Sequence, residues 1–250
     1  MVIAVCTQKG GVGKTATAQA IATGALRQGK KILSVDLDPQ GNLSFSMDGN
    51  PADSGIYELM FEHATPGQTI QHTNGQGDLL VSKNELALAD TNLTGDDRTL
   101  ALQKALKPIK KKYDVIVIDC PPTLSTLLLN ALMAADKVVI PLTADMFALQ
   151  GLYALSQTIR GAQRLNKGLQ IGGVVLTRYS ARTTLTRDIT EIIKIKCEEL
   201  SIPLYNTRIP EGIAVREAQV ARKGIFDYAA KSKPAKAYSE LVDEILKGGF

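Results

Sequence analysis

The sequence predicts a doubly wound α/β fold, in which a mainly parallel sheet carries helices on both faces. Short runs of β-branched residues alternate along the chain with longer helix-like stretches, an order typical of consecutive βαβ units. The run VIVID at 115–119 is apolar on both sides of the strand, as a central strand covered on two faces requires. A glycine-rich turn at 10–13 joins the first run directly to the first helix-like stretch.

Each expected strand is a short run rich in Val, Ile or Leu. The strands are expected at 2–6, 31–36, 78–82, 115–119, 137–141, 171–177 and near 203–205. Helices are expected at 14–28, 99–112, 123–135, 149–165, 184–200, 214–222 and 233–246. Gly29 follows the first helix and is expected to end it. Residues 42–77, rich in Gly, Asn, Ser and Thr, are expected to form loops and short helices on one side of the sheet.

The length and composition predict a globular protein with one α/β domain over 1–250, or at most two small domains, and a cytoplasmic location is expected. The longest weakly charged stretch, 124–152, contains Asp136, Lys137 and Asp145, so no membrane span is expected. The first expected strand has no basic lead before it, which argues against a signal peptide. Three widely spaced cysteines without a C-x-x-C pair argue against a disulfide framework or a zinc site. His63 and His72 are expected to be surface residues rather than metal ligands.

Charge is distributed unevenly between the two parts of the chain. Residues 1–159 contain 13 Lys and Arg against 15 Asp and Glu, whereas residues 160–250 contain 16 against 10. A basic C-terminal part suggests a polyanionic partner. Charge alone is explained equally well by an ordinary solvated surface.

The segment VIAVCTQKGGVGKTATAQAIA provides a strand, a glycine-rich turn and a helix, which is the context of a phosphate-binding loop. Gly10, Gly11 and Gly13 allow a tight turn that aims backbone N–H groups at phosphate oxygens, and the helix N-terminus adds positive potential. Lys14 is expected to reach the β- and γ-phosphates, and the Thr15 hydroxyl to coordinate Mg²⁺. The nucleotide-binding residues expected in this segment are Lys9, Gly10, Gly11, Val12, Gly13, Lys14, Thr15 and Ala16.

Three carboxylates follow expected strands. Asp119 ends VIVID, and Asp36 and Asp38 lie in SVDLDPQGN. The D-P-Q-G stretch alone would be read as a turn. Because ligands of open α/β sheets bind at the carboxyl edge, where Mg²⁺ and an attacking water need oxygen acceptors, a functional role for these acids is favoured.

These motifs together resemble the deviant Walker A ATPases of the ParA/Soj and MinD group. KGGVGKT is that family's signature loop, and DLDPQGN followed by IDCPPT is especially similar to the ParA/Soj branch. The resemblance continues through ALMAADKVVIPLTADMFALQGL, VVLTRYSARTTL and NTRIPEGIAVREAQVARKGIFDYAAKSKPAKAY, and so covers nearly the whole chain. It implies a P-loop ATPase with ATP as substrate, Mg²⁺ as cofactor and an ATP-bound homodimer.

The resemblance also offers a reason for the unusual start of the loop. Gln8 stands where the common G-x-x-x-x-G-K-[ST] pattern has glycine, and Lys9 adds a second lysine. In the family two ATP-bound monomers dock face to face, which implies that Lys9 crosses to the partner's ATP like an arginine finger. Gly10 would then let the two backbones approach closely.

Carried over residue by residue, the resemblance assigns the chemistry. Lys9, Lys14 and Asp38 are the catalytic residues, and Asp38 orients the attacking water more than it deprotonates it, so hydrolysis should be slow. Asp36 and Asp119 hold the shell of the metal indirectly, beside the direct ligand Thr15. The adenine site suggested by the relatives contains Thr177, Arg178 and Pro210.

In ParA-like relatives the ATP dimer binds DNA without sequence preference and a ParB-like centromere-binding protein stimulates hydrolysis. The resemblance therefore implies double-stranded DNA as a partner and a cytoplasmic, nucleoid-associated protein. The Soj-like relatives carry arginines at the positions of Glu211 and Ala214, so the DNA surface is expected to be rearranged here. The candidate DNA contacts are Arg182, Arg187, Arg208, Arg216, Arg222, Lys223, Lys231, Lys233 and Lys236.

Three alternatives remain open at this point. A MinD-like membrane-cycling ATPase would use a basic amphipathic C-terminal helix, but the chain ends in the acidic YSELVDEILKGGF and no stable membrane association is expected. A positioning ATPase for another cargo would share the same motifs. A scaffold that binds ATP without hydrolysing it is disfavoured by Asp38. The first strand begins at residue 2, so no N-terminal helix-turn-helix extension is expected.

Overall fold

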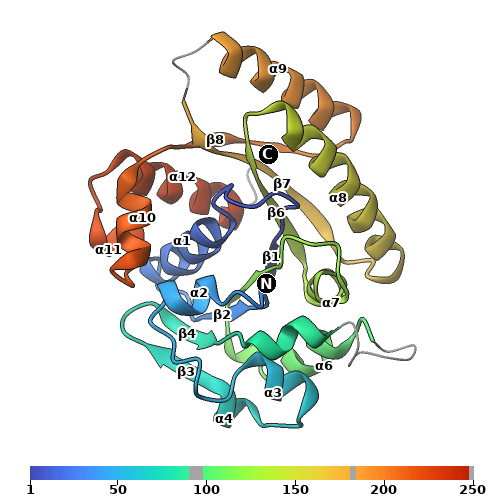
Figure 1. Ribbon diagram of the computed structural model, residues 1–250, viewed down its shortest axis with the longest axis vertical. Coiled ribbons are helices and arrows are strands. Elements are labelled where there is room, and N and C mark those ends of the chain that lie inside the picture. The colour runs from blue at the N-terminus through green and yellow to red at the C-terminus, as the bar shows by residue number, and fades with distance from the viewer. Residues whose placement is uncertain (90–97, 181–183, 248–250) are drawn as a thin grey trace.

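Figure 1 shows the computed structural model, which describes residues 1–89, 98–180 and 184–247. These residues form an eight-stranded sheet in the order β3-β4-β2-β5-β1-β6-β7-β8. Neighbouring strands are parallel, except that β3 is antiparallel to β4. The strands are β1 (Val2–Val5), β2 (Ile32–Asp36), β3 (Ile70–Thr73), β4 (Gly77–Leu80), β5 (Val115–Asp119), β6 (Lys137–Thr143), β7 (Gln170–Tyr179) and β8 (Leu204–Pro210).

Helices cover both faces of this sheet (Figure 1). The first face packs against α1 (Lys14–Arg27), α2 (Asn42–Ser46), α10 (Ile213–Val220), α11 (Ile225–Tyr228) and α12 (Lys233–Lys247). The second face packs against α3 (Ile56–Phe61), α6 (Ala101–Leu106), α7 (Thr126–Ala134), α8 (Met146–Leu165) and α9 (Thr184–Glu199). The remaining short elements are α4 (Pro66–Thr69), η1 (Asn84–Leu88) and η2 (Lys110–Lys112).

The first strand illustrates how the sequence builds two cores. Val2, Ala4 and Cys6 point into the cluster on the second face, and Ile3 and Val5 point into the cluster on the first face. All five side chains are at most 1% exposed, because side chains alternate across a strand and both faces of this strand are covered. The predicted doubly wound, mainly parallel fold is confirmed.

The structure corrects the expectations for two segments. Residues 42–77 form more than loops and short helices, since β3 lies there as an antiparallel edge strand. Its four residues, three half-buried and one exposed, are too few to show a periodicity. The helix expected at 99–112 is two pieces, because Pro108 lacks the backbone N–H that a helix interior requires, so α6 ends at Leu106 and η2 follows. Gly29 follows α1 with a left-handed φ of 77°, as expected of a residue that ends a helix.

Other elements differ from the expectation, among them β8, which continues to Pro210 instead of ending near residue 205. The helix expected at 149 begins at Met146, because the side chain of Asp145 accepts a hydrogen bond from the backbone N–H of Ala148 and caps it. The short helix α11 was not anticipated. In the part of the chain that the structure describes, no helix is both long and apolar enough to cross a membrane.

Candidate phosphate-binding site

The loop between β1 and α1 has the backbone that the glycines allow. Gly11 and Gly13 adopt left-handed φ angles of 73° and 85°, which L-residues with a side chain rarely adopt. Gly10 differs, because its φ lies outside the left-handed region; at all three glycines an added Cβ would meet none of the described atoms within 4 Å. The side chain of Gln8 lies toward α8, where its Cβ is 3.6 Å from the place of a Cβ on Gly151.

The sheet register brings the three carboxylates to this loop. Asp36 on β2 pairs with Asp119 on β5, and Asp119 pairs with Val5 on β1, the residue that leads into the loop. The carboxyl ends of three adjacent parallel strands therefore lie side by side. Asp38 follows two residues after β2, where its carbonyl accepts the turn hydrogen bond from Gly41 N.

Lys14 connects the loop to two of these carboxylates. Its Nζ lies 2.7 Å from Asp119 Oδ1 and 3.2 Å from Asp38 Oδ2, and all three side chains are nearly buried. Burial lowers the pKa of Lys14, but the carboxylates of Asp119 and Asp38 raise it by more, so the amine stays charged. The Thr15 hydroxyl donates to the second oxygen of Asp119 at 2.7 Å.

Asp36 is completely buried and holds α2 in place. Its Oδ2 accepts hydrogen bonds from the backbone N–H and the hydroxyl of Ser44, both at 2.7 Å. Burial, together with the negative charge of Asp119, raises the pKa of Asp36 above its usual value. Burial also raises the pKa of Asp119, while the charge of Lys14 opposes the shift. The carboxylate of Asp36 is thus engaged within the chain, by Ser44 of α2.

A cavity of about 430 Å³ opens beside the loop. It is lined by the loop, by Asp38, by α2 through Phe45 and Ser46, and by the β8–α10 segment. Most of the residues predicted to bind nucleotide or to act in catalysis lie in its wall: Lys9, Gly10, Gly11, Gly13, Lys14, Thr15, Ala16, Asp38, Thr177, Arg178 and Pro210. Val12, which is 1% exposed, and the buried Asp36 and Asp119 lie outside its wall.

Two of the residues predicted for the adenine site bind the loop itself. The Thr177 hydroxyl donates to the carbonyl of Val12 at 2.6 Å, and Arg178 Nη1 donates to the carbonyl of Gly11 at 3.0 Å. Arg178 has a left-handed φ of 49° and also donates to Glu211 Oε1 from Nε and Nη2. These contacts fix the loop from the side of β7.

Lys9 forms an ion pair that the sequence did not predict. Its Nζ lies 2.6 Å from Asp145 Oδ2 at the start of α8, and both side chains are partly exposed. Burial alone would raise the pKa of Asp145, but hydrogen bonds from Lys9 and Thr143 lower it below its usual value. The signal for Asp145 was present, because an acidic residue between an apolar strand and a helical pattern is a helix-capping signature. Ser44, Phe45 and Gln219 are further site residues that no motif singled out, and Glu211, noted only as a departure from the Soj-like relatives, also lines the site.

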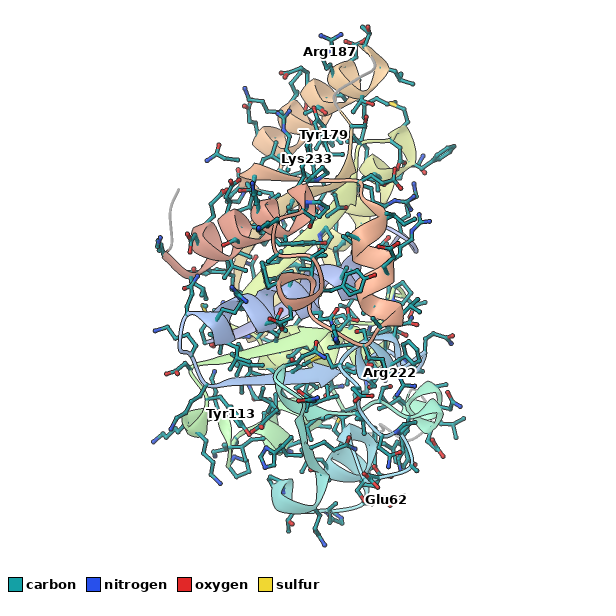
Figure 2. The ribbon with its side chains drawn as sticks, turned by 90° about the vertical axis from the view of Figure 1, so that its left-hand side faces the viewer. Glu62, Tyr113, Tyr179, Arg187, Arg222 and Lys233 are labelled. Atoms are coloured by element: carbon teal, nitrogen blue, oxygen red, sulfur yellow. The ribbon has the colours of Figure 1, made fainter. Side chains whose placement is uncertain are left out.

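The candidate DNA contacts are distributed rather than clustered. Figure 2 shows Arg187, Lys233 and Arg222 spread along the length of one side of the molecule. Arg216 lies 3.6 Å from Glu211, so part of this charge is neutralised within the chain, and Arg208 donates a hydrogen bond to the Tyr179 hydroxyl at 2.8 Å. Arg182 lies outside the described residues. His63 and His72 are exposed, and His72 Nδ1 lies 2.6 Å from Asp78 Oδ1.

The residues present fit a magnesium–nucleotide complex. The glycines leave the loop backbone open to phosphate oxygens, and Lys14 and Thr15 are bound to carboxylates of the same chain. The phosphates of the anionic magnesium–nucleotide complex would compete with these carboxylates for Lys14, and Mg²⁺ would take the hydroxyl oxygen of Thr15. Among the described residues no cluster of three or more His, Cys, Asp and Glu side chains forms a separate metal site. The chemistry of this donor set is therefore that of phosphate and a hard divalent cation.

Comparison with known proteins agrees with this geometry. Residues 1–171 match the family model of an AAA domain, and residues 113–249 match that of 4Fe-4S iron sulfur cluster binding proteins of the NifH/frxC family. The second matched region contains Cys120 and Cys197, whose side chains are at most 1% exposed in the core.

Relatives of known name cover almost the whole chain. The sporulation initiation inhibitor protein Soj of Bacillus subtilis is 37% identical and covers 99% of both chains. The chromosome-partitioning ATPase Soj of Treponema pallidum is 38% identical over 96% of this chain and 94% of its own. A crystal structure of cobyrinic acid a,c-diamide synthase from Mycobacterium smegmatis, with bound ATP analogue and magnesium, is 34% identical over 98% of this chain and 94% of its own, with a TM-score of 0.86.

Proposed function

The chain belongs to the ParA/Soj family of P-loop ATPases, and we propose that it is a DNA-partition ATPase that cycles on and off DNA with its nucleotide state. The observation that carries this proposal is that the phosphate loop lies beside Asp36, Asp38 and Asp119 at the carboxyl edge of the sheet. A relative of 34% identity with bound ATP analogue and magnesium supports ATP and Mg²⁺ as the ligands. The relatives named for chromosome partitioning support the biological role.

Different residues of the site bind the phosphates, the metal and the attacking water. Lys14 and the loop N–H groups bind and neutralise the phosphates, and Thr15, held by Asp119 at 2.7 Å, presents its hydroxyl to Mg²⁺. The metal supplies charge neutralisation to the transferring phosphoryl group. Asp38, whose Oδ1 accepts the N–H of Gln40 at 3.1 Å, orients the attacking water. Asp36 acts one step further away, by fixing α2 through Ser44.

The working form is a homodimer with nucleotide between the two copies. Two features of the loop favour this arrangement. Among the described residues nothing near Gly10 requires a glycine, and the space beside it leaves room for close approach of a second backbone. Lys9 is paired with a partly exposed carboxylate, Asp145, at 2.6 Å, from which a partner's phosphates can draw it.

The loss of Lys9 tests this arrangement. Lys9→Ala is expected to bind ATP with an affinity near that of the wild type, because Lys14 remains. It is expected not to dimerise with ATP, and to hydrolyse ATP about 10³-fold more slowly or not at all, as expected when a finger residue is removed. Steady-state phosphate release and sedimentation velocity with Mg²⁺ and ATP measure the two effects. Asp145→Ala is the matched control, since it removes the same ion pair but keeps the lysine, and should retain both dimer formation and turnover. Normal hydrolysis by Lys9→Ala would exclude a role in trans.

DNA binding rests on charge in the dimer. Each phosphate contact is weak, but two copies double their number, which makes affinity depend on nucleotide-driven dimer formation and steeply on salt. No base reading is needed for this. A ParB-like protein bound at a centromere site would then stimulate hydrolysis and release the dimer, in a cytoplasmic, nucleoid-associated cycle.

Anisotropy of a labelled random-sequence duplex tests the cycle directly. With Mg²⁺ and ATP we expect binding that weakens by about 10-fold or more when salt is raised from 50 to 200 mM, because several phosphate contacts are lost together. With ADP we expect little binding. The Lys9→Ala variant serves as control, since it keeps the basic residues and loses the dimer. Equal binding in ATP and ADP would contradict the proposed dependence on nucleotide. No binding in either state would contradict DNA as the partner and favour a membrane or protein surface, which liposome flotation would distinguish.

A further inference from the structure

Arg222, one of the candidate DNA contacts, has its side chain engaged within the chain. Its Nη1 lies 2.9 Å from Asp48 Oδ1, and its guanidinium carbon lies 4.6 Å from the centre of the Phe45 ring. Phe45 belongs to α2 and Asp48 follows it, whereas Arg222 follows α10. The side chain therefore joins the ends of two helices by an ion pair and a cation–π contact.

Two buried side-chain amides, those of Gln76 and Gln19, also join the segment after α10 to the end of α2. Gln76 Nε2 donates to the carbonyl of Arg222 at 3.1 Å, and Gln19 Nε2 donates to Gln76 Oε1 at 2.8 Å and to the carbonyl of Ser46 at 2.9 Å. Gln19 is 4% exposed and Gln76 is 2% exposed. The backbone of Arg222 has a left-handed φ of 53°, which sets its guanidinium over Phe45 while its carbonyl faces Gln76.

Both helices joined in this way line the nucleotide cavity. Phe45 and Ser46 of α2 lie in its wall, as do Val215, Arg216 and Gln219 of α10, whereas Arg222 itself lies outside it. The position of α2 also depends on Asp36 through Ser44. A contact that fixes α2 against α10 therefore fixes the shape of the cavity next to the phosphate loop.

We propose that Arg222 is a positioning residue for nucleotide binding, which ties α2 to α10 and sets the width of the cavity, rather than a contact to DNA. The inference rests on the proposed ATPase function. Ordering the wall before the nucleotide arrives lowers the cost of binding. Because the ion pair is about half exposed, its loss has a moderate effect on nucleotide affinity.

Binding of a fluorescent ATP analogue with Mg²⁺ and without DNA tests the assignment. Arg222→Asn and Asp48→Asn each keep a side chain that tolerates the left-handed backbone of these two positions. Each is expected to weaken nucleotide binding by about three- to tenfold, from the combined size of an exposed ion pair and a cation–π contact. The double variant should be no weaker than Arg222→Asn alone, since both changes break one contact. Arg164→Asn, on the exposed end of α8, is the matched control and should bind as the wild type does.

A second measurement separates positioning from DNA contact. At saturating ATP, Arg222→Asn should bind the labelled duplex with the affinity of the wild type, because a nucleotide defect is overcome by concentration. Unchanged nucleotide binding in Arg222→Asn, or weaker DNA binding at saturating ATP, would overturn the proposal. Failure of the wild type to bind the analogue would instead contradict the proposed ATPase function. Melting temperatures without nucleotide identify a variant that is merely unfolded.

Discussion

Replacing Lys14 by alanine is expected to reduce ATP affinity by at least about 100-fold, because hydrogen bonds to charged groups contribute about 1.5–3 kcal/mol each and 1.4 kcal/mol is a factor of ten. The Nζ of Lys14 is the cation between Asp38 and Asp119, at 3.2 and 2.7 Å. Without it, both carboxylates face the nucleotide's phosphates with no intervening positive charge. Isothermal titration with Mg²⁺ and ATP measures the loss.

The same substitution disturbs the fold, and the experiment must separate the two effects. Removing one partner of a buried ion pair costs about 3–5 kcal/mol of stability, because the remaining charge is left unpaired. Thermal unfolding by circular dichroism is therefore measured first, and Lys14→Gln, which keeps a hydrogen-bond donor of similar length without the charge, serves as a second variant. A folded Lys14→Ala protein that still bound ATP tightly would contradict the assignment of the phosphate site.

The core of this site was predictable because each of its parts is local in sequence. Lys14 and Thr15 follow their glycines directly, and Asp119 ends an apolar strand. Parallel topology then aligns the ends of β1, β2 and β5 without any information beyond the order of the elements. The distances among these side chains follow from that register.

Contacts between distant segments could not be predicted in the same way. Lys9 and Asp145 are 136 residues apart, and Arg222 and Asp48 are 174 apart, so no periodicity or spacing relates them. Arg222 was grouped with DNA contacts because a sequence shows its charge but not its partner. β3 was missed for a related reason, since a short edge strand is stabilised by its neighbour β4 rather than by its own pattern.

Asp38→Ala is expected to separate ATP binding from hydrolysis. The phosphates are bound by Lys14 and the N–H groups of the loop rather than by the carboxylate of Asp38. The nucleotide affinity of Asp38→Ala should therefore stay within a few-fold of the wild type. Loss of the group that orients the attacking water should slow turnover by about 100-fold or more, the usual size of such a contribution. Phosphate release and nucleotide titration measure the two quantities on one preparation.

In the proposed cycle ATP hydrolysis also controls release from DNA, so Asp38→Ala tests this step as well, which Lys14→Ala does not. If hydrolysis is what releases the dimer, Asp38→Ala with ATP should remain on the duplex after a chase with unlabelled DNA, whereas the wild type dissociates as its nucleotide is consumed. Asp53→Ala removes an exposed carboxylate of the same region and is the matched control, with turnover and release as in the wild type. Normal turnover in Asp38→Ala would remove this residue from the chemistry. Slow turnover with unchanged release would mean that hydrolysis does not time the departure from DNA, since the two rates must change together if one causes the other.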